Sequence, residues 1–266
     1  MQIWAHGSTV LGVGTSAPRA PLVKLQIASQ ISQYWRVRVL ELTGSTQDDL
    51  VKLISQGAAE NGEVIVAEFQ SAGRGRLDRN FIASAGSALL FSFYVVPKRD
   101  RADWGFLSQL AALTLHSVVA QGLEEEVLLK WPNDILIADK KVAGLIAQAT
   151  GEGVVIGIGL NVEMSLAELP VPNATSIAIA GGKKLDRNVI LSNFLDAFQQ
   201  NFQLWDRGVE FITEYTSICS TLGREVEITV VGRENHKGQA QEILKSGALL
   251  LADGFIVTVG DVVHLR

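Results

Sequence analysis

The sequence predicts an α+β fold, in which a mixed, mainly antiparallel sheet with flanking helices precedes a small β-barrel. Three observations predict it. Between Val37 and Ser220, apolar runs of strand length are interspersed with amphipathic segments of helical period. Between residues 127 and 162, strand runs follow one another without a helix, which indicates antiparallel hairpins. From Leu222 onward, short β-rich runs are separated by glycine-containing turns, a pattern typical of a small barrel.

This pattern divides the 266 residues into three parts. Residues 1–37 form a lead-in that is partly helical, with an amphipathic helix expected over Leu22–Trp35. Its glycines at 12 and 14 precede prolines rather than a helix, so they are weak evidence for a nucleotide loop. Residues 38–221 form the main domain, and residues 222–266 form the barrel. The lead-in is too short for a complete winged helix-turn-helix domain.

Each element has its own signal. The main-domain strands are expected at residues 37–42, 63–69, 88–96, 127–137, 142–150 and 153–162. The helices are expected after a capping box that starts at Ser45, over 104–121, from Asp186 to 206, and over 208–220. The barrel strands are expected at 225–231, 238–244, 248–251, 255–259 and 262–265. Pro132 interrupts the 127–137 run, which indicates a sheet edge or a bulge.

Composition excludes several classes of protein. Apolar residues make up 47% and charged residues 19% of the chain, which is a core-forming globular composition. The formal net charge of −5 argues against a generally basic nucleic-acid or membrane binder, so neither partner is expected. No apolar run reaches the roughly 18 residues of a membrane span. Cys219 is the single cysteine, and no signal-peptide pattern is evident, so a cytoplasmic location is expected.

The densest cationic stretch is Gly73-Arg74-Gly75-Arg76-Leu77-Asp78-Arg79. Its glycines allow close backbone approach, and its three arginines supply paired donors for phosphate and carboxylate oxygens. A solvated basic loop is the alternative interpretation. Contact with RNA or DNA is less favoured, because no second basic patch accompanies the loop.

A second polar stretch is Lys130-Trp131-Pro132-Asn133-Asp134, followed by Lys141 and Gly144. The intervening hairpin should keep these groups within one local unit, and a glycine inside an apolar strand indicates close approach by a ligand. The alternative is a hairpin with surface lysines.

Two further stretches carry weaker signals. Gly157-Ile158-Gly159-Leu160-Asn161-Val162 places glycines within an apolar strand, either for a ligand that lies on the sheet or for tight strand packing. Ser45-Thr46-Gln47 caps a helix, and a helix N-terminus can also receive polar ligand atoms. The chain has no Gly-x-Ser-x-Gly, Walker A or His-Glu-x-x-His motif, and its four histidines are scattered.

In this order, the motifs from Ser45 to Val162 resemble those of the biotin protein ligase family, and Gly238–Val262 is similar to that family's small C-terminal barrel. The resemblance covers residues 38–266. It implies a class II synthetase-like catalytic domain with an SH3-like barrel, in the form that lacks an N-terminal DNA-binding domain.

The resemblance also implies an activity, that of a biotin–[biotin carboxyl-carrier protein] ligase. Biotin and ATP would form biotinyl-5′-AMP with Mg²⁺, and a lysine of a biotin carboxyl carrier domain would then take the biotin. An anion that attacks a polyanion needs concentrated positive charge in a dry site, which the arginines and lysines suit. A homodimer through sheet edges is compatible with the family.

Site roles carry over by matching position. The resemblance implies catalytic roles for Arg76, Lys130, Asp134 and Lys141. It implies biotin contacts for Ser45, Thr46, Gln47, Gln70, Arg74, Gly75, Arg76, Lys141 and Gly144. It implies ATP contacts for Arg79, Lys130, Asn133 and Asn161, with Asp134 as a candidate metal ligand. The chain departs from the family pattern at Gln47, Asp78, Phe81 and Gln148.

Two other functions stay open on the sequence alone. A lipoate or octanoate ligase would share the catalytic fold, although the complete arginine loop and Lys-Trp-Pro-Asn-Asp favour biotin. A non-catalytic, biotin-sensing module is the alternative from another class, although every basic motif residue is retained.

Overall fold

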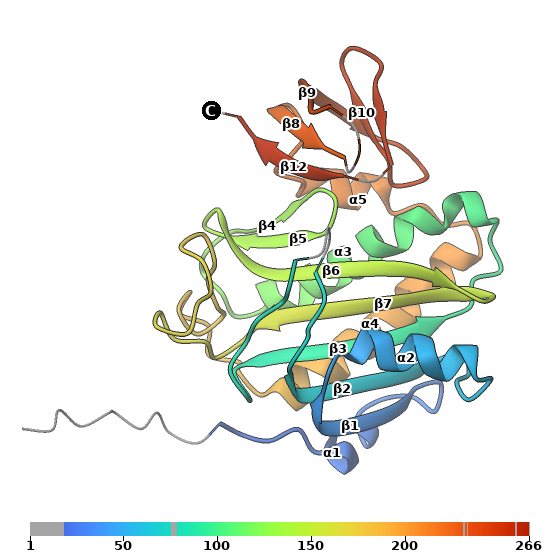
Figure 1. Cartoon of the computed structure of the whole chain (residues 1–266), viewed down its shortest axis with the longest axis vertical. Coiled ribbons are helices and arrows are strands. Elements are labelled where there is room, and N and C mark those ends of the chain that lie inside the picture. The colour runs from blue at the N-terminus through green and yellow to red at the C-terminus, as the bar shows by residue number, and fades with distance from the viewer. Residues whose placement is uncertain (1–18, 76–78, 231, 233, 259, 266) are drawn as a thin grey trace, which may run out of the picture.

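The structure is a computed structural model that describes residues 19–75, 79–230, 232, 234–258 and 260–265. It contains a seven-stranded sheet flanked by helices and a separate five-stranded sheet above one edge of it (Figure 1). The predicted α+β class is therefore confirmed. The predicted glycine pattern at residues 12–17, Arg76 and Asp78 lie outside the described residues.

The main sheet has the order β1-β2-β3-β7-β6-β5-β4. Its strands are β1 (Arg36–Thr43), β2 (Glu63–Gln70), β3 (Ala88–Val95), β4 (Val127–Lys130), β5 (Asp134–Ile137), β6 (Lys140–Thr150) and β7 (Gly153–Asn161). Only the β1–β2 pair is parallel, and the other five pairs are antiparallel. Short connections and hairpins produce this mixed sheet, as the consecutive strand runs predict.

The two faces of this sheet differ. Helices α3 (Leu107–Ala120) and α4 (Arg187–Asp206) cover one face, where Phe91 and Phe93 of β3 pack against Phe194 and Phe198 of α4. The other face carries α2 (Thr46–Ser55) and the connection 71–87 between β2 and β3, whose two arms run across the strands toward the second sheet (Figure 1). Because side chains alternate along a strand, every second residue points to this second face.

Two helices are shorter than predicted. The helix expected over residues 22–35 is α1 (Lys24–Ala28) alone, because Ser29 and Ser32 bond to nearby groups and Trp35 turns into the core with its indole N–H on the Leu195 carbonyl. The helix expected over residues 208–220 is α5 (Ile212–Ser217), preceded in the chain by α4. Residues 218 and 220 instead bond to Leu129 and complete the outer edge of β4.

The interpretation of Pro132 as a strand edge or bulge is wrong. The Trp131–Pro132 peptide bond is cis, the chain reverses there, and Lys130 pairs with Asp134 across the resulting hairpin of β4 and β5. The reversal explains how residues from a single short stretch come to face one another. The 3-10 helix η1 (Arg101–Phe106) precedes α3, so helical structure begins three residues before the predicted start at residue 104.

The second sheet has the order β11-β10-β9-β8-β12 and is antiparallel throughout, as expected for an SH3-like barrel. Its strands are β8 (Glu225–Thr229), β9 (His236–Ile243), β10 (Leu249–Leu251), β11 (Ile256–Val257) and β12 (Asp261–His264). The prediction of short strands in this region is confirmed. Within the described residues, no helix is long and apolar enough to cross a membrane.

The second sheet is docked on the main sheet through the 131–133 hairpin. The Gly247 carbonyl accepts the indole N–H of Trp131 at 2.9 Å and the amide of Gln109 at 3.0 Å. The buried Thr221 hydroxyl accepts the Trp131 N–H at 3.0 Å and lies 3.1 Å from Nε2 of His264. Buried hydrogen bonds therefore join the main sheet and α3 to the residues at the start of and within the second sheet.

The Thr221→Val variant tests the junction. Valine leaves the buried N–H of Trp131 without its acceptor, which should lower the free energy of unfolding by about 1–3 kcal/mol. Denaturant unfolding with a constant m value measures this loss. Thr221→Ser keeps the hydroxyl and is the matched control. Equal stability of the valine and serine variants would contradict the role of the hydroxyl.

The pH dependence of stability tests His264. Burial, with help from Lys130 and Arg224, lowers the pKa of His264 from 6.5 to about 4, so the folded protein keeps this ring neutral. The unfolded chain binds a proton at His264 below about pH 6.5, so stability should fall as pH drops from about 6.5 to about 4. The experiment compares unfolding free energies of wild type and His264→Gln at several pH values across this window. A wild-type loss no steeper than that of the variant would show that His264 does not contribute.

Candidate functional site

The candidate site begins with a row of residues that have little or no side chain. On β7, Gly157 and Gly159 point to the same face as α2, and Gly144 of β6 lies directly opposite Gly159. The next residue in this row is Asp134 of β5, which pairs with Gly144, and then Lys130 of β4. We call Gly157, Gly159 and Gly144 the glycine track. It leaves the sheet surface open to close approach by a ligand.

One end of the track is lined by neutral polar groups. Gln47 of α2 is 2% exposed, and its Oε1 lies 2.6 Å from the position that a Cβ on Gly157 would take. Its Nε2 donates to the Val155 carbonyl, but Oε1 has no hydrogen-bond partner among the described residues. A buried acceptor in this state is costly unless a ligand donates to it.

Neighbouring side chains hold Gln47 in place. The Ser45 hydroxyl caps α2 by accepting the Asp48 N–H, and the side-chain Oε1 of Gln70, on β2, accepts the Thr46 N–H at 2.6 Å. The Thr46 hydroxyl lies 2.8 Å from that of Ser92 on β3. The start of α2 is therefore fixed to the sheet by its capping residues, which are all buried.

The other end of the track is charged. Lys141 Nζ lies 2.6 Å from Oδ1 of Asp134 and 2.9 Å from the position of a Cβ on Gly144. Burial lowers the pKa of the neighbouring Lys130, and although Asp134 opposes this effect, Lys141 adds to it. Two cations and a carboxylate therefore face the same short stretch of open sheet.

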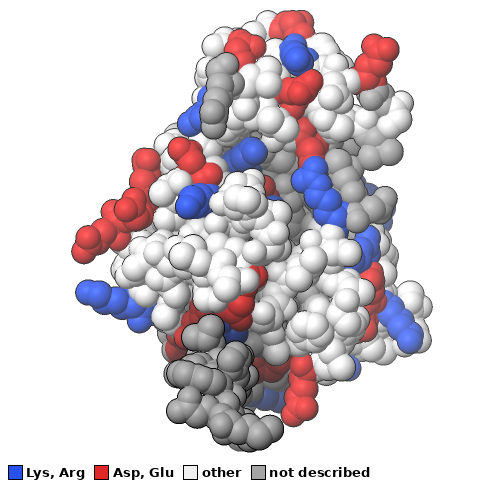
Figure 2. All heavy atoms as spheres, turned by 60° about the vertical axis from the view of Figure 1, so that its left-hand side comes forward, with Lys and Arg blue, Asp and Glu red and all other residues white. Residues whose placement is uncertain are grey.

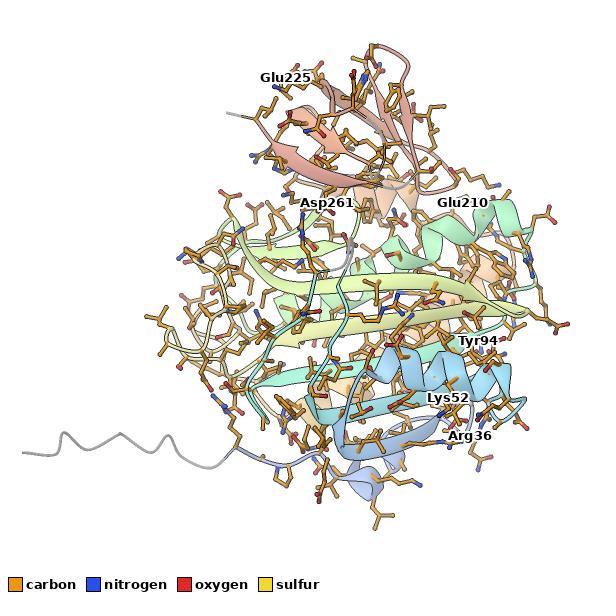
Figure 3. All side chains as sticks on the ribbon, in the orientation of Figure 1. Arg36, Lys52, Tyr94, Glu210, Glu225 and Asp261 are labelled. Carbon is orange, nitrogen blue, oxygen red and sulfur yellow. The ribbon has the colours of Figure 1, made fainter. Side chains whose placement is uncertain are left out.

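The described parts of the arginine stretch, residues 73–75 and 79, pair with each other and with residues 80–81 in a narrow ribbon above the sheet. The Gly75 N–H donates to the Arg79 carbonyl at 2.6 Å, and Arg74 bridges to Asn80. The Arg74 guanidinium lies 2.6 Å from Asp48 on α2. The Arg79 guanidinium pairs with Asp261 of β12. Asp261 lies where the second sheet faces the main one (Figure 3). The ribbon thus touches both α2 and the second sheet.

Phe81 closes the ribbon and rests on the glycine track. Its ring atoms lie 2.6 Å from the position that a Cβ on Gly159 would take, so a side chain there would displace the ring. Phe81 also packs in a small apolar cluster on this face with Ala83, Ala88, Leu90, Met164 and Leu169. In this structure, an aromatic ring covers the middle of the track.

Two asparagines that were predicted to contact ATP form hydrogen bonds with backbone groups instead of facing open space. Asn133 donates through its amide to the Leu145 carbonyl, and its own carbonyl accepts the Leu145 N–H. Asn161 donates to the Thr175 carbonyl at 2.9 Å. Both side chains are at most 8% exposed. These amides fix the 131–133 hairpin and the 173–177 segment beside Lys141.

The structure brings together most of the residues that the sequence singled out. The track ends gather Thr46, Gln47, Gln70, Lys130, Asp134, Lys141 and Gly144 on one face, and Arg74, Gly75 and Arg79 form the ribbon above it. Sequence reasoning missed Ser92 and Asp261. Ser92 could have been found as the polar residue within the apolar run 88–95, whereas Asp261 offers no such signal.

The acidic residues at the site do not form a metal cage. The Asp134 carboxylate is paired with Lys141, and that of Asp261 with Arg79. Among the described residues, no group of three or more His, Cys, Asp or Glu side chains could hold a metal ion. The donor set therefore does not fit a resident metal.

Other surface features lie apart from this face. A cavity of about 390 Å³ opens between the end of α3 and the start of α4, on the opposite side of the sheet. On the face seen in Figure 2, basic and acidic side chains are interspersed. This arrangement does not resemble the continuous basic surface of a nucleic-acid binder.

Comparisons with known proteins converge on one family. A model of the biotin/lipoate A/B protein ligase family matches residues 39–164. The chain is 35% identical over 260 residues to a biotin--[acetyl-CoA-carboxylase] ligase of Mycobacterium tuberculosis, across 93% of this chain and 97% of that protein. It is 29% identical over 270 residues to the bifunctional ligase/repressor BirA of Escherichia coli, across 97% of this chain and 83% of that protein. A solved biotin protein ligase from Aquifex aeolicus, in complex with biotin and ATP, has a TM-score of 0.73 and 27% identity, across 87% of this chain and 99% of that one.

The unpartnered oxygen of Gln47 leads to a stability prediction. The Gln47→Met variant keeps the length of the side chain and removes both the unpaired acceptor and the Nε2 donor to the Val155 carbonyl, so its unfolding free energy should stay within about 1 kcal/mol of the wild-type value. Asn188→Leu is the contrasting control, because the buried amide of Asn188 is bonded on both sides. Denaturant unfolding of both variants provides the measurement. If Gln47→Met loses as much stability as Asn188→Leu, the amide of Gln47 stabilises the folded protein and is not reserved for a ligand.

Proposed function

Since this chain belongs to the biotin/lipoate A/B protein ligase family, we propose that it is an ATP-dependent biotin–protein ligase. It activates biotin to biotinyl-5′-AMP and transfers the biotinyl group to a lysine of a biotin carboxyl carrier domain. The relatives that are named biotin--[acetyl-CoA-carboxylase] ligase, and a solved biotin protein ligase in complex with biotin and ATP, support this proposal.

The glycine track is the observation that carries the proposal. Biotin has a neutral ureido ring with N–H donors at one end and a carboxylate at the other. The track offers the unpartnered Gln47 oxygen at one end and the Lys141 ammonium at the other, and its own glycines contribute no side chain between them. The Phe81 ring, which rests on Gly159 in the free protein, must shift for a ligand to lie on the track. The chemical order of the groups in the ligand matches their order along the sheet. A lipoate ring has no N–H to donate, so it would leave the Gln47 oxygen unpaired.

In the first half-reaction, the carboxylate oxygen of biotin attacks the α-phosphorus of ATP, and pyrophosphate leaves. Lys141 holds the carboxylate in place, while Arg74, Arg76 and Arg79 offset negative charge at the phosphates. Lys130 lies beside Lys141 and adds positive charge at the same point. The pairs that these cations make with Asp134 and Asp261 would exchange for substrate oxygens.

In the second half-reaction, the neutral amine of the acceptor lysine attacks the acyl carbon of the mixed anhydride, an amide bond forms, and AMP leaves. The acceptor enters as an ammonium, so it first loses one proton to water, and the attacking nitrogen loses a second proton to water as the amide forms. Asp134 is released from Lys141 once that ammonium binds the acyl group, and it then orients the incoming amine. Phe81 and the arginine ribbon exclude water from the anhydride.

The remaining assignments follow from the same proposal. Ser45, Thr46, Gln47, Gln70 and Gly144 line the biotin end, whereas Asn133 and Asn161 support the nucleotide end through the backbone that they hold. Mg²⁺ enters as the complex of ATP, bound mainly by phosphate oxygens and water. The catalytic domain spans residues 38–221 and the barrel residues 222–266. The protein acts in the cytoplasm, and a homodimer is compatible with this function.

A radiolabelled transfer assay tests the function. The full-length chain is incubated with labelled biotin, MgATP and a carrier domain, and each component is omitted in turn. We expect label on the carrier domain only in the complete mixture, and pyrophosphate release with biotin but not with lipoate or octanoate. Transfer of lipoate or octanoate in place of biotin would support the related ligase. Biotin binding without transfer would support a sensing module.

The Gln47→Met variant connects this assay to the site. Loss of the acceptor for the ureido N–H should raise the KM for biotin by about tenfold or more, while the KM for ATP stays near the wild-type value. Steady-state pyrophosphate release measures both constants. An unchanged KM for biotin would show that the ureido end binds elsewhere.

A further inference from the structure

Residues 19–23, which we call the N-terminal strap, are held by side chains from distant parts of the chain. Glu68 of β2 accepts the Leu22 N–H, and its carboxylate lies 2.7 Å from the Arg187 guanidinium. Arg187 in turn donates to the Ala20 carbonyl at 2.7 Å. Asn188 accepts the Val23 N–H at 2.7 Å and donates to the Pro21 carbonyl at 3.0 Å. The strap is therefore an ordered part of the sheet's surroundings rather than a loose lead-in.

Arg19 at the start of the strap bridges two segments that are far apart in sequence. Its guanidinium donates to the carbonyls of Ala85 at 3.4 Å and Glu163 at 2.9 Å, and it lies 2.6 Å from the Glu168 carboxylate. Its side chain is only 16% exposed. The hydrogen bond from Arg19 lowers the pKa of Glu168 to about 2, so this carboxylate stays charged and paired at neutral pH.

Both segments lead directly into the candidate site. Ala85 belongs to the arm of the connection that begins at Phe81, whose ring lies on the glycine track. Residues 163–168 begin the loop that runs to Asn173, whose carbonyl accepts the N–H of Lys141 at 2.8 Å. Figure 1 shows the strap beside the lower end of the 71–87 connection. Arg19 thus fastens, from outside, the two segments that position Phe81 and Lys141.

We propose that Arg19 is a positioning residue for the ligase reaction, which holds the 81–87 arm against the 163–168 segment and so keeps Phe81 closed over a ligand that lies on the track. The inference rests on the proposed function. Arg19 touches neither substrate, and it acts through the two segments that it joins. Without its fork of donors, the arm and the loop can separate, water can reach the acyl-adenylate, and hydrolysis to biotin and AMP competes with transfer.

The shape of the arginine side chain is essential to this role. A planar guanidinium can serve two carbonyls and a carboxylate at once, whereas a lysine ammonium has no such fixed fork. Since the Arg19 and Glu168 side chains are mostly buried, replacing Arg19 should also lower the free energy of unfolding. The effect on the site is therefore measured by the KM for biotin and by AMP release, which a general loss of stability would not change selectively.

The test compares Arg19→Gln and Arg19→Lys with Arg36→Gln in the full-length chain. Arg36 is the matched control, because it also bridges a backbone carbonyl and carboxylates, but from β1 and well away from Asp261 (Figure 3). For Arg19→Gln, we expect the KM for biotin to rise by about tenfold and AMP release without acceptor to increase, with kcat within about twofold of wild type. Arg19→Lys should be intermediate. Wild-type KM and AMP release in Arg19→Gln, or equal changes in Arg36→Gln, would overturn the proposal.

Hydrogen exchange separates this inference from the proposed function. In Arg19→Gln, amides of residues 81–88 and 163–175 should exchange faster than in wild type, whereas Arg36→Gln should leave both segments unchanged. If the wild type forms no adenylate from biotin and ATP, the ligase proposal fails, and exchange alone then decides whether Arg19 joins the two segments. Equal exchange in both variants would overturn that role.

Discussion

The site depends on one steric constraint, which is that Gly157, Gly159 and Gly144 leave a strip of the central sheet without side chains. Because Gly144 and Gly159 pair directly across β6 and β7, their positions are fixed by register rather than by loop conformation. A ligand laid on this strip can contact backbone that would otherwise be covered. The polar groups at the two ends are then separated by the width of rigid strands, which hold them more precisely than loops would.

The electrostatics of the site follow from this placement. In a chain with net charge −5, three of the described cations at the site each pair with a carboxylate, Lys141 with Asp134, Arg79 with Asp261 and Arg74 with Asp48. Pairing of this kind limits the cost of bringing several cations together before an anionic substrate arrives. The acids at the site therefore serve the free protein as counterions for positions that the substrate oxygens would later occupy.

Local patterns were enough to predict much of this arrangement. Alternation along the strands predicted the sheet, the capping box predicted the start of α2, and the hairpin between Asp134 and Lys141 predicted that both would lie in one local unit. Ser92 lies opposite Gly157 because of the register between β3 and β7. The sequence of one strand does not determine that register, so this neighbour could not be predicted. The pairing of Arg79 with Asp261 and the contacts of Thr221 with His264 arise from the docking of two sheets. Tertiary contacts also explain why α1 and α5 are shorter than predicted. Trp35 and residues 218–220 have a helical sequence pattern, but they bond to distant parts of the chain instead of continuing the helices.

The 131–133 hairpin has a consequence for how the two sheets can evolve. Its Trp131 side chain anchors the turn at Gly247, while its flanking residues Lys130 and Asp134 face the glycine track. The same few residues thus belong both to the junction between the sheets and to the candidate site. The C-terminal sheet is for this reason not an exchangeable module. A barrel taken from another protein would need a carbonyl and a hydroxyl at matching positions before Lys130 and Asp134 could keep their positions on the glycine track.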